Sequence, residues 1–144
     1  MKRLSLAPLV AALLLAFPPY ASAHEDAQPG ARTPEKLGSV QFPTSCDPAV
    51  QPLVERAVSL LHSFWFPEGL KAFNDVLQRD PSCTIAYWGI GVNRLLNPFA
   101  GQPPEAALLA GQDAVDKGMA AGAKTDRERD YLAAIASFYG RDRA

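Results

Sequence analysis

Apolar residues recur at helical spacing through most of the chain from Asp47 onward. The first apolar run covers residues 53–64, where positions three and four apart carry the large side chains. This period places those side chains on one face of an amphipathic helix. Asp47 supplies a cap and Pro48 a first-turn proline. Because Pro52 cannot donate a hydrogen bond and is tolerated only in a first turn, the regular helix is expected to begin near Gln51.

The same signals predict four more helices. The second opens at Pro67-Glu68 and ends at Asp80-Pro81, and the third covers about residues 82–96. The fourth opens at Pro104-Glu105 and runs to about residue 120. Thr125 and Glu128 form a capping box that begins the fifth, which continues to about residue 139. Because no run alternates with the period of a strand, the pattern predicts an all-α fold.

The pattern before Asp47 is different. Lys2 and Arg3 precede an apolar run over residues 4–17, and Ala21-Ser22-Ala23 supplies the small residues that a signal peptidase accepts. We therefore predict a cleaved secretory signal over residues 1–23, with an uncleaved anchor as the alternative, and a secreted or periplasmic location. Residues 24–45 are predicted to be a disordered or extended leader, and residues 46–144 a helical domain.

Charge and cysteine content narrow the choice of partners. Without Lys2 and Arg3, 12 basic residues remain against 15 acidic ones, a formal charge of −3. This mild acidity argues against nucleic acid or an anionic membrane surface as a partner after signal cleavage. In an oxidising compartment, Cys46 and Cys83 are predicted to form a disulfide rather than a metal site.

One stretch carries a family resemblance. Gly69, Phe73, Val76 and Pro81 have the spacing of small, aromatic, aliphatic and proline residues in the tetratricopeptide repeat (TPR), which this stretch resembles. The resemblance implies antiparallel helical hairpins stacked as a short α-solenoid. The fourth helix departs from the pattern, because Ala110 stands where the family has an aromatic residue.

A second resemblance covers residues 38–140. The runs at residues 42–46, 61–66 and 80–83 are similar to the amino-terminal part of exported bacterial TPR proteins of unknown function. Such proteins are usually longer, so the chain is expected to be a fragment or a truncated product. On this view Phe138 and Tyr139 form a face that awaits a neighbouring helix.

In the TPR family, the first helix of each hairpin lines a concave groove that binds protein or peptide partners. Carried over by position, the groove residues of this chain are Gln51, Val54, Val58, Leu61, His62, Ile85, Trp88, Val92, Leu95 and Leu96. They imply an apolar groove for an apolar helix or an extended segment, with Trp88 as the anchor. The alternative is that the chain's own leader or later helices fill the groove.

The residues indicate no catalytic site or cofactor. We expect His62 to be a hydrogen-bonded structural histidine, because no carboxylate or second histidine is placed to share a ligand site with it. The charged residues 126–130 are predicted to be a solvated helix start. The favoured hypothesis is therefore a binding scaffold in the cell envelope. The alternatives are the scaffold part of a larger enzyme and a non-functional truncated product.

Overall fold

The structure, a computed structural model, describes residues 36–140, and within that range it contains helices and loops but no strand. In chain order, the elements are a 3-10 turn at Pro48–Val50, α1 (Gln51–His62), α2 (Phe66–Arg79), α3 (Thr84–Arg94), α4 (Glu105–Ala121) and α5 (Asp126–Phe138). The all-α prediction is confirmed for these residues, with helix ends close to the predicted ones. The predicted signal over residues 1–23 and the leader up to residue 35 lie outside the described residues. Between residues 36 and 140, no helix combines the length and apolar character of a membrane span.

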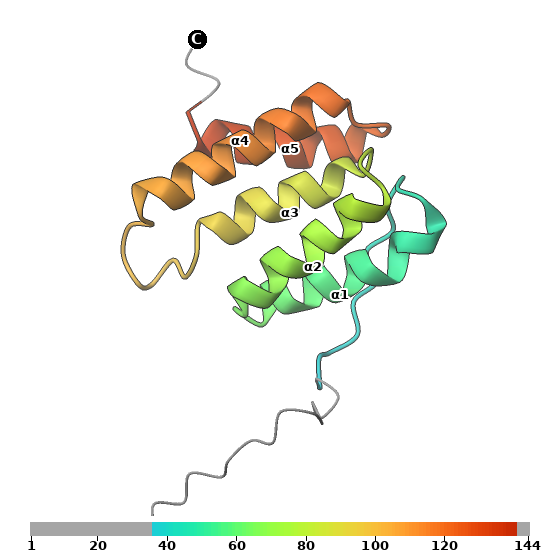
Figure 1. Ribbon diagram of the computed structural model, residues 1–144, viewed down its shortest axis with the longest axis horizontal. Coiled ribbons are helices and arrows are strands. Elements are labelled where there is room, and N and C mark those ends of the chain that lie inside the picture. The colour runs from blue at the N-terminus through green and yellow to red at the C-terminus, as the bar shows by residue number, and fades with distance from the viewer. Residues whose placement is uncertain (1–35, 141–144) are drawn as a thin grey trace, which may run out of the picture. The chain divides into compact units, whose positions relative to one another are not determined.

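Helices α1 and α2 form one antiparallel hairpin, α3 and α4 form a second, and α5 packs against α3 and α4 (Figure 1). The main core lies where the apolar faces of α1, α2 and α3 meet, and Leu60, Phe73 and Ile85 are its largest fully buried apolar side chains. A smaller cluster joins α3 to α4 and α5. Because Trp88 and Val92 of α3 contact both clusters, α3 is the central helix of the described fold.

Small residues let the helices around α3 approach closely. A side chain at Gly89 would overlap the ring of Phe73, which is fully buried in the neighbouring helix α2. On the other side, the Tyr139 hydroxyl donates a hydrogen bond to the backbone oxygen of Gly91 at 2.8 Å. A side chain at Gly111 would overlap that hydroxyl. Burial raises the pKa of Tyr139 to about 12, so this hydroxyl is a neutral donor at physiological pH.

A disulfide between Cys46 and Cys83 joins the chain before α1 to the turn before α3, and both cysteines are buried. The predicted disulfide is thus confirmed. The Asp80 carboxylate reinforces the same corner by accepting hydrogen bonds from the Asp47 amide (2.8 Å), the Ser82 amide (3.0 Å) and the Ser82 hydroxyl (2.6 Å). These bonds, chiefly that from the hydroxyl, hold the pKa of Asp80 below its usual range. The two sulfurs near Asp80 are bonded to each other and are therefore not available as metal ligands.

We expect the double variant Cys46→Ser/Cys83→Ser to fold but to lose about 3–4 kcal/mol of unfolding free energy, because the disulfide restricts the unfolded chain across 37 positions of sequence. Urea titration of the variant beside the oxidised wild type measures this loss. An unchanged midpoint in the two proteins would contradict it.

We also expect Gly89→Ala to destabilise the protein by about 1–3 kcal/mol, since the buried Phe73 ring has to move to admit a methyl group. Gly38→Ala is the matched control, because a β-carbon at that position meets nothing within 4 Å. Thermal unfolding of both variants compares the two costs. Equal melting temperatures would show that the α2–α3 contact is not close-packed.

Candidate binding groove

An extended segment of the chain lies over the helices before the first of them begins. We call residues 37–45 the strap; Leu37, Val40 and Phe42 of the strap pack against the main core. The Phe42 ring stacks on Trp88 of α3, with ring centroids 5.9 Å apart, and meets the edge of Tyr131 of α5 at 5.6 Å. The strap therefore places an aromatic side chain on the face shared by α3 and α5.

Side chains of α1 hold the strap backbone on one side. The Gln51 amide donates to the Phe42 carbonyl at 2.7 Å, and its oxygen accepts from the Thr44 amide at 3.2 Å and the Thr44 hydroxyl at 2.8 Å. The Phe42 amide donates to the Glu55 carboxylate at 3.3 Å. These contacts satisfy main-chain groups that an extended segment cannot satisfy within itself.

Residues at the start of α5 hold the strap from the other side. The Arg127 guanidinium donates to the Pro43 carbonyl at 2.6 Å and lies 4.6 Å from the centre of the Phe42 ring. The Glu128 carboxylate accepts from the Ser45 amide at 2.7 Å and from the Ser45 hydroxyl. As a result, the strap is bound between α1 and α5.

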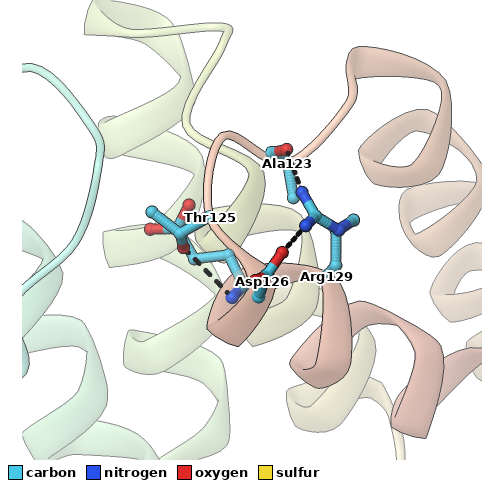
Figure 2. Close-up of polar contacts among 5 residues, drawn as sticks. Ala123, Thr125, Asp126 and Arg129 are labelled. Carbon is cyan, nitrogen blue, oxygen red and sulfur yellow. Dashed lines mark hydrogen bonds and ion pairs between the residues drawn. The ribbon is translucent and has the colours of Figure 1, made fainter.

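The first turn of α5 explains why Glu128 is available for this role. Figure 2 shows the Thr125 side chain capping the helix, and it accepts from the Glu128 amide at 3.3 Å. It also shows Arg129 paired with Asp126 and donating to the Ala123 carbonyl. The predicted capping box is only half formed, because the Glu128 carboxylate binds Ser45 instead of turning back to Thr125. Glu128 is also 1% exposed, so the prediction of a solvated helix start is wrong for this residue.

Next to the strap, the same face is open. It forms a cavity of about 430 Å³, which we call the open cleft. The strap, all helices except α4, and the loops that follow α1 and α3 contribute to its wall. Its lining residues are Phe42, Leu61, His62, Phe64, Phe66, Trp88, Val92, Leu95, Leu96, Pro98 and Tyr131. A second cavity of about 870 Å³, between the loop before α4 and the end of α5, shares Leu95, Leu96 and Pro98 with it. The apolar surface therefore continues past the cleft toward Phe138.

The structure divides the predicted groove residues into three groups. The first group lines the open cleft and consists of Leu61, His62, Trp88, Val92, Leu95 and Leu96. Gln51 instead binds the strap. Val54, Val58 and Ile85 are fully buried in the core, so in this conformation they offer no surface to a partner.

His62 does not have the structural role that we predicted for it. It is the last residue of α1 and is exposed, and the described residues provide its imidazole with no hydrogen-bond partner. Its ring forms part of the cleft wall. Because the remaining lining residues are aliphatic, aromatic or proline, the cleft can bind a partner mainly by burying apolar surface.

Several residues of this site were not identified when groove positions were carried over from the TPR pattern. Phe42 and Tyr131 form an aromatic cluster with Trp88, and Glu55 and Glu128 anchor the strap. The sequence did contain one usable signal, because Phe42 lies in a short apolar segment made extended by the following proline. The contacts with Tyr131 and Glu128 link positions more than 80 residues apart, and no local pattern predicts them.

Comparison of the chain with family models, with curated proteins and with solved structures finds no match.

We expect Glu128→Ala to loosen the strap, because the Ser45 amide and hydroxyl lose their acceptor. The loss of unfolding free energy should be about 1–3 kcal/mol. Hydrogen exchange of the Phe42, Thr44 and Ser45 amides should accelerate, as mass spectrometry can measure. The exposed Asp130 of the same helix provides the control Asp130→Ala, whose exchange should match the wild type. Equal protection of the strap in both variants would contradict the anchoring role of Glu128.

Proposed function

We propose that this chain is an exported TPR-like helical repeat protein that acts as a protein- or peptide-binding scaffold in the cell envelope, without catalysis of its own. The observation that carries the proposal is the open cleft beside the strap. The strap shows that this face can hold a polypeptide segment by aromatic stacking and main-chain hydrogen bonds. The cleft offers further apolar surface on the same face.

The exposed residues at the rim of the cleft favour a macromolecular partner over a small molecule. Phe64 is 54% exposed and Leu96 is 36% exposed, and both lie where the chain leaves a helix. Exposed apolar residues that gather around a concavity are typical of interaction sites. An aromatic wall such as that of Phe42, Trp88 and Tyr131 is the kind of surface in which binding energy concentrates.

The order of the helices supports the repeat part of the proposal. Helix α5 packs against the α3–α4 hairpin, just as α3 packs against the α1–α2 hairpin (Figure 1). In stacked hairpins each unit buries its apolar face on its neighbour, and the first helices of successive units line one shared surface. Here α1, α3 and α5 all contact the strap and line the open cleft.

The test begins with a photo-reactive amino acid at Leu96 in the exported protein, followed by identification of the envelope protein that it captures. The purified partner is then titrated against Leu96→Glu. Met119→Glu is the control, since Met119 is also an exposed apolar residue (52%, against 36% for Leu96) but lines neither cavity of this face. We expect Leu96→Glu to weaken binding by at least about tenfold and Met119→Glu to leave it unchanged. Equal affinities of the two variants would contradict binding at the cleft. Trp88 is less suitable for this test because it also holds Phe42.

A further inference from the structure

We infer that the open cleft takes an amphipathic α-helix of the partner, with large apolar residues at i, i+3 or i+4, and i+7, and not an extended segment. The inference rests on the proposed function and specifies the secondary structure of the partner segment that binds. It follows from a difference in hydrogen-bonding side chains between the surface under the strap and the open cleft.

The part under the strap is rich in groups that bind main chain. An amide, two carboxylates and a guanidinium face the strap, on Gln51, Glu55, Glu128 and Arg127. Lys124 adds a contact of its Nζ with the Ser45 carbonyl at 3.4 Å. An extended segment needs such partners, because its amides and carbonyls point sideways and cannot pair with each other.

The open cleft has a different composition. None of its lining side chains carries a carboxylate, an amide, a guanidinium or an ammonium group, and its only polar side-chain groups belong to His62, Trp88 and Tyr131. An extended segment placed here would find only these three polar side chains to pair with its main-chain groups. Each buried, unpaired group would cost about 1–3 kcal/mol.

A helix avoids this cost because its main-chain groups pair within the helix. Its apolar face needs only matching apolar surface, which the cleft supplies. The site also continues the interface already occupied by the strap, since Phe42 forms one wall of the cleft. An apolar side chain of the partner helix would pack against the exposed part of Phe42, and the next turn would lie along Val92 and Leu96.

The backbone at the rim provides a second observation. Phe64 and Leu96 are the only non-glycine residues between positions 36 and 140 with positive φ, at 58° and 60°, and both line the cleft. Glycine or asparagine adopts this conformation at lower cost after a helix. At both positions the chain instead carries a large apolar side chain and directs it to the same cleft. Phe64 there packs against the Phe66 ring of the same wall, with centroids 5.8 Å apart, and the exposed parts of Phe64 and Leu96 are available to the partner helix.

The experiment is selection of random peptides of about 16 residues, or roughly four helical turns, on the disulfide-intact protein by phage display. Selected peptides are then titrated against the wild type, Leu96→Gly and the control Met119→Ala. We expect the selected sequences to lack internal proline and to repeat large apolar residues at i, i+3 or i+4, and i+7. Leu96→Gly should weaken their binding by about tenfold while the unfolding free energy stays level or rises, because glycine relieves the positive φ.

The outcomes separate this inference from the proposed function. Leu96-dependent peptides with proline, or with apolar residues at every second position, would overturn the helical partner and leave the scaffold proposal standing. Helical peptides whose binding ignores Leu96→Gly would place the helix elsewhere and also overturn the inference. Failure to select any peptide that binds would contradict both the inference and the proposed function.

Discussion

The bond between Cys46 and Cys83 determines where the strap joins the helices, and the face that carries the strap and the open cleft depends on that junction. The Asp80 carboxylate fixes the same corner through the amides of Asp47 and Ser82. From this point the strap runs between α1 and α5, and Phe42 stacks on Trp88 a few residues upstream. The open cleft is the part of the face that the strap, held at this corner, leaves uncovered.

Local chemistry accounts for what could be predicted from the sequence. Pro67 and Thr125 mark the starts of α2 and α5 because a first-turn proline and a hydroxyl cap act within one turn of helix. Asp80-Pro81 marks the end of α2 for a similarly local reason. The disulfide was predictable because the chain has only two cysteines, so the prediction needed only the expectation of an oxidising compartment.

The face that carries the strap and the open cleft depends on contacts that no local signal encodes. Val58 and Ile85 were assigned to the groove by position, but a small rotation of a helix decides whether such a residue faces a groove or the core, and here both face the core. Glu128 was predicted to complete a helix cap, but its carboxylate instead accepts a hydrogen bond from Ser45, 83 residues away in the sequence. Conversely, His62 and Leu96 line the open cleft, and each ends or follows a helix.

The strap has a consequence for cooperativity. In a stack of hairpins each helix contacts only its neighbours, so the last helix can fray while the first stays folded. Here the strap hydrogen-bonds both to α1, through Gln51, and to α5, through Glu128, although these two helices share little direct contact. Opening of α5 therefore also exposes the main chain ahead of α1. The strap couples the first and the last of the described helices, which makes local unfolding of either helix a shared event.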